Sequence, residues 1–146
     1  MEKPILVAVD FEEASSRALV EAQAIGAGLR APIALVHVYR MPIYSYPSIE
    51  PVPMPPPMMA ALEIAEAARE ALGKLAASVG IPPELTFVRE GDPAGEILAA
   101  ARELSARMIA LGTHGRRGLA HMLLGSVAEQ VVRRSSVPVL TVRVAA

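Results

Sequence analysis

Short apolar runs alternate along the chain with longer stretches that have helical spacing. The apolar runs lie at residues 5–9, 33–38, 108–111 and 137–144, and a weaker run of alternating apolar and polar residues lies at 85–89. Apolar runs of four to eight residues, rich in Val and Ile, are typical of strands buried on both faces of a sheet. The pattern therefore predicts five strands.

Two helices are expected between the first three strands. The first follows apolar positions from residue 14 to residue 25 and fades at Gly26 and Gly28. The second follows apolar positions from 62 to 79, and Gly80 comes where a C-terminal glycine is favoured.

Two further helices are expected in the second half of the chain. One opens at Asp92-Pro93, where Asp can cap the helix and Pro fits its first turn. Its inward face would consist of Ile97, Leu98, Ala101 and Leu104. The other spans about residues 126–134 and begins with a capping-box spacing, Ser126 followed by Glu129.

The order of these elements predicts the fold class. Regular alternation of strands and helices favours an α/β fold with one open, mostly parallel five-stranded sheet and helices on both faces. We expect a single domain over residues 1–146. Residues 41–59, which hold seven prolines and four methionines, are predicted to form a long loop without helix. This loop is either a tolerated insertion or a lid or partner-binding segment.

Composition and charge exclude several classes of protein. With 53% hydrophobic residues, the chain has enough apolar surface to fold, and its apolar runs are too short to cross a membrane. A net charge of -1 and 3% aromatic residues argue against nucleic acid as a partner. The absence of cysteine removes disulfides and thiolate chemistry. The first residues lack the pattern of an export signal, so we expect a cytoplasmic protein.

The ends of the first and fourth strands carry the candidate chemistry. Asp10 follows the first strand, where its carboxylate either accepts hydrogen bonds from ribose hydroxyls or caps the next helix. The fourth strand runs into Gly112-Thr113-His114-Gly115-Arg116-Arg117-Gly118, and Gly125-Ser126 then begins a helix. Glycines allow close backbone approach to a ligand, and a helix N-terminus suits a phosphate. Ser126 as a helix cap is the alternative.

Other site types fit the sequence less well. Neither a Rossmann fingerprint nor a P-loop motif is present. His37 lies in an apolar run and is interpreted as a buried, hydrogen-bonded residue, while His114 and His121 lack a metal-ligand spacing. A response-regulator receiver would need an aspartate after the third strand and a lysine after the fifth, and neither is found where it is needed.

These features resemble the universal stress protein family. The spacing of Gly112, Gly115, Gly125 and Ser126 matches the ATP-binding signature of that family, G-x2-G-x9-G-(S/T). The first strand running into Asp10, the Leu35-Val36-His37-Val38 segment and residues 135–140 resemble the family as well. The resemblance covers the chain apart from residues 41–59.

The resemblance implies that the chain binds ATP, with Mg2+ held on the phosphates. Ala8, Val9 and Asp10 would line the adenosine, with Asp10 at the ribose, and the backbone of Val38 would meet the adenine. The loop and helix after the fourth strand would surround the ribose and phosphates through Leu111, Gly112, Thr113, His114, Gly115, Arg116, Gly125, Ser126 and Val127. No catalytic or metal-ligating residue is expected.

The resemblance also implies a homodimer that pairs through residues 139–144. The balanced charge, with a net value of -1, predicts contact with neither nucleic acid nor membrane. The preferred function is a nucleotide-dependent regulatory or stress-response protein. A slow ATPase or phosphotransferase that uses the same site is the alternative. It is less favoured, because phosphoryl transfer would need further acidic groups to hold a metal ion. A family member that has lost the nucleotide is a further alternative, against which the intact glycines argue.

Overall fold

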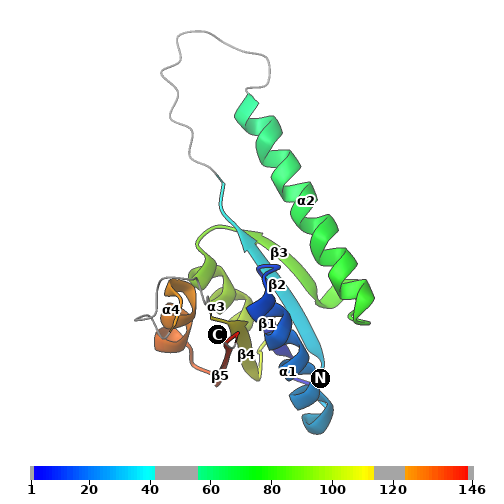
Figure 1. The fold of residues 1–146 in the computed structure, drawn as a ribbon, viewed down its shortest axis with the longest axis vertical. Coiled ribbons are helices and arrows are strands. Elements are labelled where there is room, and N and C mark those ends of the chain that lie inside the picture. The colour runs from blue at the N-terminus through cyan, green and yellow to red at the C-terminus, as the bar shows by residue number, and fades with distance from the viewer. Residues whose placement is uncertain (1, 42–55, 114–123, 145–146) are drawn as a thin grey trace.

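The computed structural model describes residues 2–41, 56–113 and 124–144, and shows a layered α/β fold (Figure 1). The elements, in chain order, are β1 (Ile5–Ala8), α1 (Glu13–Leu29), β2 (Ile33–Tyr39), α2 (Pro56–Ser78), a 3-10 turn (Pro83–Leu85), β3 (Thr86–Glu90), α3 (Pro93–Glu103), β4 (Met108–Gly112), α4 (Ser126–Arg134) and β5 (Val139–Val142). All nine expected helices and strands are therefore present.

The five strands form one parallel sheet in the order β3-β2-β1-β4-β5. In the centre, Ile5 of β1 lies opposite Ile33 of β2 and Met108 of β4. The chain builds outward from β1 first through β2 to β3, and then through β4 to β5. The strand order thus reverses between β1 and β4, and ligands of open α/β sheets bind at such a point, beyond the carboxyl ends of the strands.

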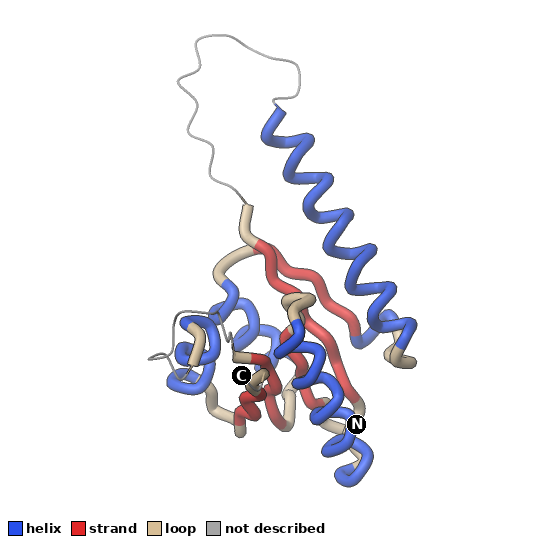
Figure 2. The backbone as a smooth tube through the Cα atoms, in the orientation of Figure 1, coloured by secondary structure: helices blue, strands red, loops and turns tan. Residues whose placement is uncertain are grey.

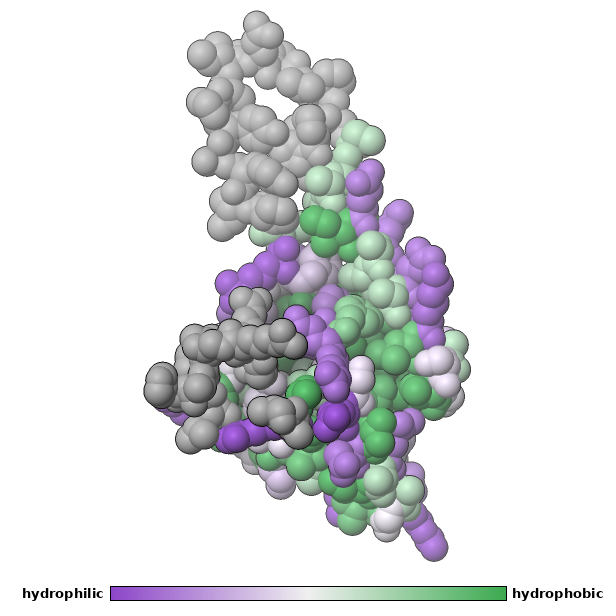
Figure 3. All heavy atoms as spheres, in the orientation of Figure 1, coloured by the Kyte–Doolittle hydropathy of each residue, from purple (hydrophilic) through white to green (hydrophobic). Residues whose placement is uncertain are grey.

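Two helices cover each face of the sheet. Alternate residues of β1 point to opposite faces, as a strand requires. Ile5 and Val7 pack in one apolar cluster with residues of α1 and α2, while Leu6 and Ala8 pack in the other with residues of α3 and α4. In Figure 2 the strands lie between these two layers, with α2 beside β3. Hydrophilic residues cover the outer side of α2 in Figure 3.

Prolines precede three of the strands at the amino edge of the sheet. Pro4, Pro32 and Pro138 stand directly before β1, β2 and β5. Proline lacks an N–H group and is tolerated at a strand start. Each proline still accepts a hydrogen bond, because its carbonyl oxygen lies 2.8–3.0 Å from the backbone nitrogen of a neighbouring strand or its approach.

Two helix boundaries differ from the predicted ones. Helix α1 continues through Gly26 and Gly28 and ends only at Leu29, where Arg30 takes a left-handed conformation with φ 55°. Helix α2 begins at Pro56, so the prediction that residues 41–59 contain no helix is wrong for 56–59. Prolines at 56 and 57 fall in the first turn, where a helix has no N–H group to bond. Residues 42–55 of the expected loop lie outside the described residues.

The expected capping box of α4 does not form. Gly125 occupies the N-cap position, and Ser126 is the first helical residue. No side chain of the described residues caps the helix. Helix α3, in contrast, begins as predicted, because the Asp92 carboxylate accepts a hydrogen bond from the Gly95 nitrogen at 2.9 Å. Among the described residues, no helix is long and apolar enough to cross a membrane.

Candidate functional site

A pocket of about 180 Å3 lies at the carboxyl edge of the sheet, between the ends of β1, β2 and β4 and the starts of α1, α3 and α4. It is mostly aliphatic, and it sits where the strand order reverses. Its lining residues are Ala8, Val9, Asp10, Ser15, Val36, Val38, Pro93, Ile97, Leu111, Gly112, Gly125, Val127 and Ala128. We call it the carboxyl-edge pocket.

The carboxyl-edge pocket brings together many of the residues selected from the sequence. Eight of them line it, namely Ala8, Val9, Asp10, Val38, Leu111, Gly112, Gly125 and Val127. Ser126 is exposed at the start of α4 and is not among the lining residues. Thr113 is buried, and its backbone nitrogen and hydroxyl both bond the Val142 carbonyl of β5. His114, Gly115 and Arg116 lie outside the described residues.

Five lining residues were not expected at this site from the sequence: Ser15, Val36, Pro93, Ile97 and Ala128. Two of them carried a usable signal, since Pro93 was expected in the first turn of a helix and Ile97 on the inward face of the same helix. Residues at the start of α3 must approach the carboxyl ends of the strands in a parallel sheet. Ser15 and Ala128 carried no such signal.

Asp10 organises the turn that connects β1 to α1. Its carboxylate accepts a hydrogen bond from the Glu12 nitrogen at 2.9 Å, and its own nitrogen donates to the Ser15 hydroxyl at 3.3 Å. Glu12 is the N-cap residue of α1, so Asp10 stands two residues before the cap and does not occupy it. Phe11, between them, has φ 64°. The two hydrogen bonds of Asp10 contribute to holding the carboxylate at the rim of the pocket.

His37 supports the same turn from β2. Its Nδ1 lies 2.7 Å from the Val9 carbonyl oxygen, which can only accept, so Nδ1 carries the hydrogen. The ring of Phe11 lies 4.7 Å from the imidazole between centroids. His37 is partly buried and hydrogen-bonded, which agrees with its interpretation as a structural residue.

Gly112 allows β4 and α1 to meet beside the pocket. A Cβ atom at this position would lie 2.4 Å from the backbone carbon of Ala14 and 2.6 Å from the Ser15 nitrogen. No side chain fits there, because the neighbouring atoms are backbone and cannot turn aside. Glycine thus brings the start of α1 against the end of β4.

The start of α4 is the electropositive wall of the site. Its N-cap, Gly125, has no side chain, and no side chain of the described residues caps the helix. The first N–H groups of a helix lack intrahelical partners and carry the positive end of its dipole, which favours an anion. Among the described residues, no cluster of three or more acidic or histidine side chains is placed to hold a metal ion.

Comparison with known proteins gives a consistent result. The model of the universal stress protein family matches residues 1–143. Universal stress protein YxiE of Bacillus subtilis is 33% identical over 149 residues, which cover 95% of this chain and 97% of YxiE.

Two solved structures resemble the fold closely. The universal stress protein UspA of Lactobacillus plantarum has a TM-score of 0.74 and 25% identity, covering 97% of each chain. A universal stress protein solved in complex with cAMP has a TM-score of 0.61 and 25% identity, again covering 97% of each chain.

Proposed function

Since the chain belongs to the universal stress protein family, we propose that it binds ATP in the carboxyl-edge pocket. On this proposal it acts in the stress response as a dimeric, nucleotide-dependent regulator. The observation that carries the proposal is the position of Asp10 and the uncapped start of α4 on the same aliphatic pocket. A ribose and a phosphate chain need these two features at a short distance from an apolar base site.

The lining residues fit the three parts of the nucleotide. Aliphatic side chains such as Val36, Val38 and Ile97 would pack against the adenine ring. The Asp10 carboxylate would accept hydrogen bonds from the ribose hydroxyls. The pocket is smaller than the roughly 300 Å3 at which whole-ligand sites begin, so it suits the adenosine part. The phosphates, with Mg2+ on them, would lie toward the start of α4.

A structural relative supports the choice of an adenine nucleotide, because it was solved in complex with cAMP. The lining residues also favour binding over fast turnover. Asp10 is the single acidic residue among the lining residues that the structure describes, and phosphoryl transfer needs metal-holding and positioning groups around the γ-phosphate. We therefore propose a binding protein, with slow hydrolysis as the second candidate.

A titration with Mg-ATP and with adenosine tests the proposal. Asp10→Ala should weaken both ligands by about tenfold or more, because the lost partner is the ribose and hydrogen bonds to a charged group contribute about 1.5–3 kcal/mol. Asp10→Asn, whose amide oxygen still accepts, should weaken both less. Glu63→Gln, on the exposed side of α2, should change neither affinity.

A second variant separates ligand approach from folding. Gly125 has φ -66° and ψ 160°, a conformation open to any residue, so Gly125→Val should fold. We expect this variant to lose more affinity for ATP than for adenosine, because the phosphates would lie beside residue 125. Unchanged ATP affinity in a folded Gly125→Val protein, or a loss confined to ATP in Asp10→Ala, would contradict the placement of the phosphates or of the ribose. Native mass spectrometry of the purified protein reports whether ATP is retained without hydrolysis.

A further inference from the structure

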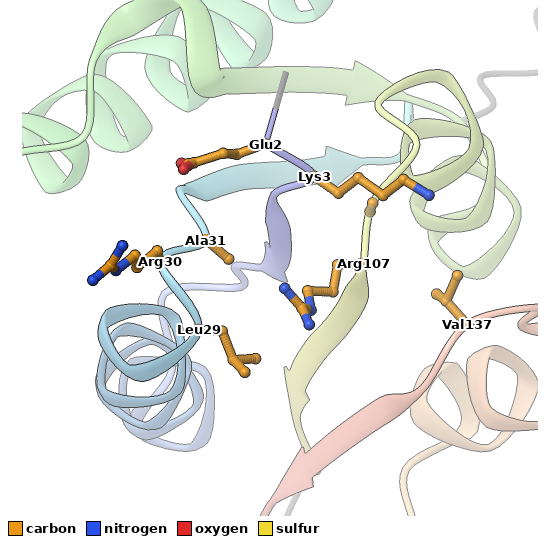
Figure 4. Close-up of a pocket in the computed structure, with 8 residues that line it drawn as sticks. Glu2, Lys3, Leu29, Arg30, Ala31, Arg107 and Val137 are labelled. Carbon is orange, nitrogen blue, oxygen red and sulfur yellow. The ribbon is translucent and has the colours of Figure 1, made fainter.

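A larger cavity lies at the opposite, amino edge of the sheet. Its volume is about 650 Å3, and it is bordered by the segment before β1, the end of α1 and the residue before β4. Figure 4 shows Arg107 projecting into the middle of this space, with Lys3 extending toward the α3 side and the Arg30 side chain directed outward at the rim beside α1. Basic residues from three separate segments thus line this cavity.

A second pocket of about 220 Å3 adjoins the first. The two share Lys3, Ala106 and Val137, and the second adds Arg102 from the end of α3 and Arg134 from the end of α4. The two pockets therefore lie side by side at this edge of the sheet and share part of their walls. We call the two pockets together the amino-edge groove.

Basic residues outnumber acidic ones in the lining of the amino-edge groove. It contains five basic residues and one acidic residue, Glu2. In the part of the chain that the structure describes, none of the five forms a salt bridge, whereas Arg89 and Arg133 do. The five basic residues are Lys3, Arg30, Arg102, Arg107 and Arg134.

The C-terminal ends of three helices offset part of this positive charge. Helices α1, α3 and α4 end at this edge, and each C-terminus carries a partial charge of about -0.5 that nearby arginines offset. Even with these ends and Glu2 included, the groove keeps an excess of roughly two to three positive charges. Lys3 and Arg107 lie outside the helices. The backbone nitrogen of Arg107 donates a hydrogen bond to the Pro4 carbonyl at 2.8 Å, which fixes this residue at the edge of the sheet.

We propose that the amino-edge groove binds a small polyphosphate anion. The larger of its two pockets falls within the roughly 300–1,000 Å3 typical of small-molecule sites. Guanidinium groups bind phosphates through two parallel hydrogen bonds, and ammonium groups bind them as point charges. Cations in both pockets suit a ligand with two or more phosphate groups. The groove shares no lining residue with the carboxyl-edge pocket, so this inference does not depend on ATP binding there.

Calorimetry with inorganic tripolyphosphate tests the proposal, using two double variants of equal net charge. Lys3→Gln with Arg107→Gln removes two cations of the groove. Arg17→Gln with Lys74→Gln removes two exposed cations on α1 and α2. We expect the groove variant to lose about tenfold or more in affinity and the control less than twofold. Affinity should also fall as salt rises.

Amide chemical shifts locate the bound anion. Tripolyphosphate should move the signals of Lys3, Ala31 and Arg107 in the wild-type protein, and thermal unfolding checks that each variant is folded. Equal loss of affinity in the two double variants would overturn the proposal in favour of non-specific attraction. Shifts confined to residues near Asp10 and Gly125, or no binding at millimolar concentration, would overturn it as well.

Discussion

At the scale of single residues, close packing rather than chemistry determines Gly112. The start of α1 lies against this residue so closely that any Cβ atom would overlap backbone atoms of Ala14 and Ser15. Those atoms belong to the first turn of a helix and can move only if the helix moves. The end of β4 and the start of α1, which meet beside the carboxyl-edge pocket, can therefore pack together only with a glycine at position 112.

Gly112→Ala should destabilise the protein by about 2–3 kcal/mol, because overpacking against rigid neighbours costs that much. Gly73→Ala is the matched control. Gly73 lies inside α2 with no atom within 4 Å of the added Cβ, so Ala should stabilise the protein by about 0.5–1 kcal/mol. Urea unfolding measures both. Equal effects in the two variants would show that α1 yields to the new methyl group.

At the scale of elements, one arginine ties the outer strand β3 to helix α3. The Arg89 Nε donates to Glu96 at 2.9 Å, and its two terminal nitrogens donate to the two oxygens of Glu103 at 2.8 and 2.9 Å. Only 24% of the Arg89 side chain is exposed. The hydrogen bonds from Arg89 lower the pKa of Glu103 from its ordinary value of 4.5, despite the exposure of this carboxylate. The same interaction raises the pKa of Arg89.

This bridge predicts a pH-dependent stability. Because the pKa of Glu103 is lower in the folded protein, its contribution is present above pH 4.5 and is lost as the pH falls through the folded-state value. Glu103→Gln should therefore be less stable than the wild-type protein at pH 7, and the difference should shrink at acid pH. Glu70→Gln, which removes an exposed pair on α2, should show a smaller difference at pH 7. A difference for Glu103→Gln that stays constant with pH would contradict the bridge.

At the scale of the whole molecule, the sheet has β5 at one end, and we propose that this strand forms the dimer. The bonds from Ile109 to the Pro138 carbonyl and from Thr113 to the Val142 carbonyl show that even-numbered residues of β5 face β4. The backbone groups of Thr141 therefore face away from the sheet. An outer strand with free backbone groups pairs readily with another strand.

Thr141→Pro removes one outward N–H group and leaves the bonds to β4 intact, since proline is tolerated on the outer side of an edge strand. We expect the variant to dissociate into folded monomers at concentrations where the wild-type protein and Thr141→Val remain dimeric. Analytical ultracentrifugation measures this. A Thr141→Pro dimer of unchanged affinity would exclude pairing through this strand.

Local patterns sufficed for the elements and for part of the site. Alternation of apolar runs with helical spacing predicted four helices and five strands in a mostly parallel sheet, and the cap at Asp92 formed as expected. Local signals for where a helix begins or ends were less reliable. The glycines at 26 and 28 do not end α1, because Arg30 takes the left-handed C-cap conformation and its backbone nitrogen donates to the Gly26 carbonyl. Ser126 does not cap α4, because the preceding glycine takes the cap position.

The sequence by itself determined what depends on neighbours a few residues away: the period of each element, most helix starts, and the glycine spacing after β4. Only the tertiary structure decided which residues from distant segments meet. The strand order places Asp10 and the start of α4 on one pocket, and gathers Lys3, Arg107 and Arg134 at the opposite edge. Such groupings arise from packing between elements far apart in the chain, for which local spacing carries no signal.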